Sequence, residues 1–121
     1  MPFVTRTVHA YLDYPVALSL MILPFVLNLG TSNPLAKWLA VATGVSAFFL
    51  TVLTDHELGV IKVVPYRVHV AVDRLVGTVF IAAPFVLGLS GLDAVYYWAN
   101  GATVLLVTLV LNAADREHAL A

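Results

Sequence analysis

Two His–Asp pairs with the same spacing are the residues of this chain whose types could do chemistry. His9 and Asp13 are four positions apart, and His69 and Asp73 repeat the pattern sixty positions later. Residues four apart lie on the same face of an α-helix. Two such helices packed face to face would therefore bring two imidazoles and two carboxylates together.

Such a group has three chemical uses, and the spacing leaves all three open. Two neutral imidazoles and two carboxylates could bind a divalent metal ion. His9 and His69 on opposed helices could instead ligate the iron of a b-type haem from its two sides. A carboxylate beside an imidazole could also relay protons in a small ion or proton transporter that acts as an oligomer.

The four residues also have an interpretation that needs no ligand. Each histidine could satisfy its own aspartate, and the aspartates could pair with Arg67 or Arg74. Asp13 lies 16 residues before Leu29, which is about 24 Å along a helix. In a ~30 Å hydrocarbon core it would lie only about 6 Å from the near edge. A carboxylate at that depth can reach water, which favours the structural interpretation.

The repeat extends well beyond these pairs. The same shift of sixty positions matches further residues, among them Val8 with Val68, Pro24 with Pro84, Phe25 with Phe85, Leu29 with Leu89, and Trp38 with Trp98. A fixed period of this kind indicates a duplicated structural unit. We expect one membrane domain, 1–121, with repeat one at about 8–57 and repeat two at about 68–117.

The composition indicates a protein whose solvent is lipid. Hydrophobic residues make up 61% of the 121 residues and charged residues only 11%, whereas soluble domains carry about 25% charged residues. The net charge of -1 gives no reason to expect nucleic acid as a partner. The absence of cysteine removes disulfides and thiolate metal sites.

Four apolar segments of about 20 residues predict transmembrane helices, because about 20 residues at 1.5 Å each cross a ~30 Å core. The predicted helices are about 8–29, 34–54, 65–89 and 94–113. The fold class is therefore all-α, a four-helix membrane bundle built from two tandem hairpins.

Individual residues add detail to these helices. Pro24 and Pro84 are expected to kink the first and third helices, because proline lacks the N–H of the helical bond. Asn33 and Asp93 are expected to be N-caps of the second and fourth helices. Small residues that recur four positions apart allow helices to pack closely in lipid. This small-residue stripe consists of Ala36, Ala40 and Gly44.

The basic residues predict the orientation. Five of them fall on the side that holds both termini and the central loop, against Lys37 alone on the other side: Arg6, Lys62, Arg67, Arg74 and Arg116. By the positive-inside rule both termini are cytoplasmic. Each repeat has an even number of helices, so both insert the same way. We therefore expect a pseudo-two-fold axis along the membrane normal.

Two short motifs resemble a known family. The segments LPFVLNL at 23–29 and APFVLGLS at 83–90, each followed by a tryptophan, are similar to the SPW-repeat family of small bacterial membrane proteins. Leu23 or Ala83 stands where that family has serine, and Phe25 or Phe85 where it has tryptophan. The resemblance implies a tandem two-helix unit in the bacterial inner membrane and no settled biochemical role, so it assigns no site residue.

No catalytic motif appears in the sequence: G-x-S-x-G, the P-loop, H-E-x-x-H and G-x-G-x-x-G are all absent. The leading hypothesis is a non-enzymatic integral membrane protein, a scaffold or oligomer subunit with a cytoplasmic-side His/Asp cluster. Its expected partners are the lipid bilayer and further copies of itself. The metal or haem protein and the small transporter are the alternatives.

Overall fold

The computed structural model describes residues 5–55 and 58–110, which form four helices and no β-strand. The all-α class is therefore confirmed over this part of the chain. The bounds of the first three helices differ from the predicted ones by one to three residues, whereas the fourth begins three residues earlier and ends as an α-helix at Leu105. The elements are α1 (Arg6–Val26), α2 (Leu35–Leu53), α3 (Tyr66–Leu87) and α4 (Gly91–Leu105), followed by a π-helical turn, η1 (Leu106–Val110).

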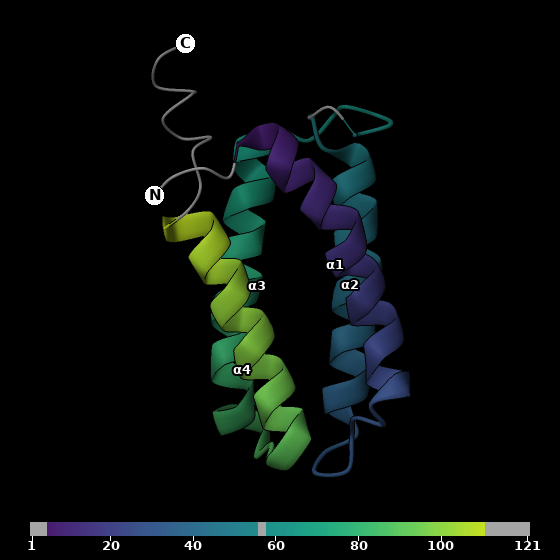
Figure 1. Ribbon diagram of the computed structural model, residues 1–121, viewed down its shortest axis with the longest axis vertical. Coiled ribbons are helices and arrows are strands. Elements are labelled where there is room, and N and C mark those ends of the chain that lie inside the picture. The colour runs from purple at the N-terminus through teal and green to yellow at the C-terminus, as the bar shows by residue number, and fades with distance from the viewer. Residues whose placement is uncertain (1–4, 56–57, 111–121) are drawn as a thin grey trace.

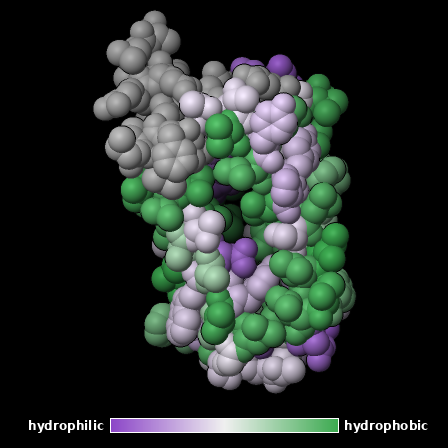
Figure 2. All heavy atoms as spheres, in the orientation of Figure 1, coloured by the Kyte–Doolittle hydropathy of each residue, from purple (hydrophilic) through white to green (hydrophobic). Residues whose placement is uncertain are grey.

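The helices pair as two hairpins. Helix α1 packs mainly on α2, and α3 packs mainly on α4. Figure 1 shows both hairpin turns at the bottom, whereas the start of α1 and the end of α2 lie at the top. Figure 2 shows a hollow in the middle of this face, between α4 and α1. The two hairpins are therefore separate packing units that meet at a limited number of places.

Three helices are long and apolar enough to cross a membrane: Thr7–Val26, Leu35–Leu53 and Tyr66–Leu87. Large apolar side chains lie exposed on the outside of the molecule, among them Val26, Phe49, Leu75, Phe85 and Val86. Such side chains are favourable in lipid and costly in water. These features indicate a membrane protein. The fourth predicted span, 94–113, covers α4 and η1, and its last residues lie outside the described part.

The repeated Pro-Phe-Val-Leu motif ends a helix in both hairpins. Asn28 and Gly88 take left-handed backbone conformations, with φ of 51° and 65°. The N–H of Leu29 donates to the carbonyl of Pro24 at 2.9 Å, and Leu89 does the same to Pro84 at 2.9 Å. This is the Schellman arrangement that closes helix C-termini. Pro24 and Pro84, expected to kink long helices, thus lie in the last turn of α1 and α3.

The small-residue stripe on α2 is buried, as predicted. Ala36, Ala40 and Gly44 all face the interior of the molecule. A Cβ atom added to Gly44 would lie 2.9 Å from the carbonyl oxygen of Ala17 on α1. The backbones of α1 and α2 therefore touch at this point, and only glycine leaves room for the contact.

At the turn end, each hairpin hydrogen-bonds to the other. The Asp93 carboxylate accepts from the N–H groups of Gly30 and Ser32 at 2.8 and 3.0 Å and from the Ser32 hydroxyl at 2.5 Å. The Asn33 side chain donates to the carbonyl of Leu87 at 3.0 Å. Its Oδ1 accepts from the N–H of Leu35, the first residue of α2, at 3.0 Å, whereas the N-cap position predicted for Asn33 is held by Pro34. Asp93, predicted to be the N-cap of α4, lies instead in the first turn, because α4 already begins at Gly91.

Asp93 makes the link between the turns sensitive to pH. Burial alone would raise the pKa of Asp93, but the hydrogen bonds from Ser32 and from the backbone N–H of Gly30 outweigh it and hold the pKa below its usual value. A lowered pKa means that the ionised form stabilises the fold. The ionised carboxylate contributes its full stabilisation at pH values above the pKa that Asp93 has in the unfolded chain. This stabilisation is lost as the pH falls through the pKa of Asp93 in the folded protein.

Asp93→Asn is therefore expected to destabilise the protein at pH 7 by about 1.5–3 kcal/mol, the usual contribution of hydrogen bonds to a charged group. The difference from wild type is expected to shrink below about pH 4. Denaturant unfolding in detergent micelles at several pH values measures it, with the exposed Asp55→Asn as control. A difference that stays constant with pH would contradict the role of the Asp93 charge.

Candidate functional site

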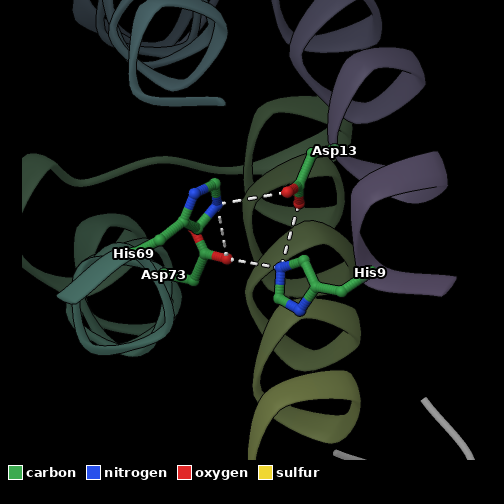
Figure 3. A group of neighbouring side chains, drawn as sticks. All are labelled: His9, Asp13, His69 and Asp73. Carbon is green, nitrogen blue, oxygen red and sulfur yellow. Dashed lines mark hydrogen bonds and ion pairs between the residues drawn. The ribbon is translucent and has the colours of Figure 1, made fainter. Parts of the chain in front are cut away.

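The two predicted His–Asp pairs converge between α1 and α3, and Figure 3 shows their side chains pointing at one another. His9 Nε2 lies 3.0 Å from Asp13 Oδ1 and 2.9 Å from Asp73 Oδ2. His69 Nε2 lies 3.3 Å from Asp13 Oδ2 and 3.3 Å from Asp73 Oδ2. Each imidazole therefore contacts both carboxylates, its own and the one from the other repeat.

The two histidines of the four-residue group are buried, and its two aspartates are partly buried. His9 and His69 are 3% and 2% exposed, and the side chains of Asp13 and Asp73 are 10% and 20% exposed. Carboxylates near the membrane edge were expected to reach water, and both aspartates keep a small exposed fraction. The packing of α1 against α3 removes most of that water, because the two pairs face each other.

Tyr66 packs against both histidines. Its ring meets His9 edge to face at 5.5 Å between centroids and stacks beside His69 at 6.5 Å. The ring is itself buried. An aromatic wall of this kind keeps the imidazoles in fixed orientations and shields their nitrogens from solvent.

The segment 58–65 brings His69 to the end of α2. Its backbone folds back on the helix, so that Val60 donates to the carbonyl of Val52 at 2.7 Å and Val64 donates to that of Leu53 at 2.8 Å. These bonds satisfy carbonyls that a helix C-terminus leaves without partners. α3 begins directly afterwards, at Tyr66. As a result, Thr54 Oγ1 lies 2.6 Å from His69 Nδ1.

Arg67 and Arg74, predicted as charge partners of the aspartates, differ in their surroundings. Arg74 donates from Nη2 to the carbonyl of Thr108 in η1 at 2.5 Å. Arg67 is exposed. Asp13 and Asp73 each form ion pairs with His9 and His69. Each carboxylate therefore lies next to both imidazoles, which carry a positive charge when they are protonated.

A small metal ion fits between the four side chains. One donor atom from each residue lies within 4.8 Å of the other three. Ligands at about 2.1 Å from a tetrahedral ion lie about 3.4 Å from one another. The imidazole nitrogens lie 2.9 to 3.3 Å from carboxylate oxygens, His9 from Asp13 Oδ1 and His69 from Asp13 Oδ2, and both from Asp73 Oδ2. Two imidazole nitrogens and two carboxylate oxygens form a donor set that transition dications such as Zn²⁺ and Co²⁺ accept.

The same geometry opposes a haem at this place. Both Nε2 atoms lie close to one oxygen, Asp73 Oδ2, at 2.9 and 3.3 Å. Two histidines that ligate one haem iron approach it from opposite sides of a flat macrocycle. The direct N–O contacts occupy the space that this macrocycle would need. Of the cofactors that the sequence suggested, the geometry favours the metal ion.

Two residues of this site did not emerge from the sequence analysis, Thr54 and Tyr66. A comparison of the two repeats offers a weak signal for each, because Ala114 stands sixty positions after Thr54 and Arg6 sixty before Tyr66. The contacts of Thr54 and Tyr66 with His69 depend on the fold of the loop, which no spacing reveals.

Comparison with protein-family models, with curated proteins and with solved structures finds no match to this chain. Its function is therefore inferred from the geometry of the four-residue group and its surroundings.

Proposed function

We propose that this chain is a non-enzymatic integral membrane protein that binds one divalent transition-metal ion between its two hairpins. The observation that carries the proposal is the convergence of four donor atoms, from His9, Asp13, His69 and Asp73, within 4.8 Å of one another. Two of these ligands come from each repeat. The ion would thus join α1 to α3 and hold the hairpins together at the end opposite the turns.

Charge supports a dication at this place. Two carboxylates in a buried position are strongly unfavourable without a compensating positive charge. A divalent ion between two neutral imidazoles supplies the required two charges. Protonated imidazoles would supply them too, and the group would then be a purely structural cross-link. A measurement of metal binding distinguishes a bound dication from a pair of protonated imidazoles.

The proposal includes four membrane crossings. The fourth crossing is the predicted span 94–113, which begins after Asp93 and of which α4 and η1 cover 94–110. Such a span has about as many residues as a ~30 Å core requires. In this arrangement both ends of the chain face the cytoplasm and the hairpins are related by an axis along the membrane normal. The resemblance to the SPW-repeat family and the assembly into homo-oligomers belong to the same proposal.

Titration of the purified protein in detergent with Zn²⁺ tests the function. After removal of metal with a chelator, isothermal calorimetry is expected to give one ion per chain, and Co²⁺ is expected to produce the visible absorption of a tetrahedral site. A protein that binds neither ion above the level of a His9→Ala/His69→Ala double variant would contradict the proposal.

A further inference from the structure

We infer that Thr54 is a positioning residue that sets which nitrogen of His69 faces the site, and so suits the site to a transition dication. The inference rests on the proposed function and deepens it. Thr54 is fully buried at the end of α2. Its Oγ1 atom lies 2.6 Å from the carbonyl oxygen of Leu50 and 2.6 Å from His69 Nδ1.

The two contacts of Thr54 fix the hydrogen on His69. A hydroxyl group carries one hydrogen, and a carbonyl oxygen can only accept. The hydroxyl of Thr54 therefore donates to Leu50, and its oxygen accepts from the N–H at His69 Nδ1. In the neutral imidazole the remaining nitrogen, Nε2, then carries a lone pair. This lone pair faces Asp13 and Asp73, each 3.3 Å away.

A lone pair that faces two carboxylates is the arrangement of a metal ligand. Histidines bound to metals usually donate the other ring N–H to an oxygen, which orients the ring and makes the bound nitrogen more basic. Thr54 supplies that oxygen here. Mg²⁺ and Ca²⁺ prefer oxygen ligands, whereas Zn²⁺ and Co²⁺ accept imidazole. Holding Nε2 in place therefore favours the second class of ion.

The other histidine lacks an equivalent partner. His9 Nδ1 is buried and makes no hydrogen bond to residues 5–55 or 58–110. The residue sixty positions after Thr54 is Ala114, which lies outside the described residues and has no hydroxyl. The positioning effect is therefore specific to His69.

Substitution of Thr54 tests the inference with Co²⁺ as the probe and excess Mg²⁺ as the competitor. Thr54→Val keeps the shape and removes the acceptor, so it is expected to weaken Co²⁺ binding about 10- to 100-fold, the usual effect of losing such a partner. Thr54→Ser restores the oxygen and is expected to bind like wild type. The matched control is Thr51→Val, because Thr51 is also buried and its hydroxyl donates to the carbonyl one turn back, at Ala47.

Equal Co²⁺ affinity in Thr54→Val and wild type would overturn the inference, and so would an equal loss in Thr51→Val. The ¹⁵N NMR signals of His69 at alkaline pH provide a readout that needs no metal. The hydrogen is expected on Nδ1 in wild type and redistributed towards Nε2 in Thr54→Val. If wild type binds no metal, the proposed function fails. The NMR result then decides separately whether Thr54 sets the state of His69.

Discussion

Replacing His69 with alanine is expected to weaken Zn²⁺ binding by at least about 100-fold. The loss of a partner that only orients a ligand already costs about 10- to 100-fold, and this substitution removes the ligand itself. His69 Nε2 contacts both carboxylates, and Thr54 holds its ring from the other side. His9→Ala is expected to weaken binding less, because His9 Nδ1 has no such hydrogen bond within the described chain.

The aspartates provide a matched test of the same site. Asp13→Asn and Asp73→Asn keep the shape of the side chain and remove its charge, so each is expected to weaken Zn²⁺ binding strongly. Asp55→Asn makes the same chemical change at an exposed position near the end of α2 and is the control. Calorimetric titration of the four proteins measures the effect. Equal affinities in Asp55→Asn, Asp13→Asn and Asp73→Asn would show that the ion binds elsewhere.

Gly44→Val is expected to produce the largest loss of stability. A Cβ atom at this position would lie 2.8 Å from Met21 Cγ and 2.9 Å from both Leu20 Cβ and the carbonyl oxygen of Ala17. The Met21 side chain can move, but the backbone of α1 cannot move without separating the two helices. Overpacking of this kind typically costs about 1–3 kcal/mol, and the backbone contact places the variant at the upper end.

Unfolding by denaturant in detergent micelles measures this loss, with Ala42→Val as the control because Ala42 lies on the exposed face of the same helix. Gly101→Val is expected to have a comparable effect in the second hairpin, where its Cβ would lie 2.9 Å from the carbonyl oxygen of Gly77. Wild-type stability in Gly44→Val would mean that α1 and α2 do not touch at this point.

The repeated His–Asp spacing in the sequence predicted the most important feature of the site. Two copies of the His–Asp spacing on two helices implied that all four side chains could meet, and they do. The small-residue stripe likewise predicted the buried face of α2. These features follow from spacing within a helix, which the sequence contains in full.

Features that depend on the path of the loops could not be predicted from the sequence. The contact of Thr54 with His69 exists because segment 58–65 folds back on α2 through main-chain hydrogen bonds. Main-chain hydrogen bonds of this kind depend little on residue type, so the sequence does not reveal them. For the same reason Asp93 was expected to cap its own helix, whereas it receives hydrogen bonds from the turn of the other hairpin.

The prolines illustrate a different difficulty. Pro24 and Pro84 fall inside long apolar segments, where a kink is the ordinary consequence. Whether each proline lies in the middle or in the last turn of its helix depends on where that helix ends. The helices end where Asn28 and Gly88 take left-handed conformations. Gly88 is a common residue for this conformation, but the segment before it is so apolar that a longer transmembrane helix was predicted.

The most direct test of the metal site is X-ray absorption spectroscopy at the zinc edge on protein that has been loaded with Zn²⁺ and freed of excess ion. We predict one zinc per chain, with two imidazole nitrogens and two carboxylate oxygens at about 2.0–2.2 Å. The imidazole signal is expected to disappear in the His9→Ala/His69→Ala variant. A zinc shell without imidazole, or the same shell in that variant, would contradict the metal site between the hairpins.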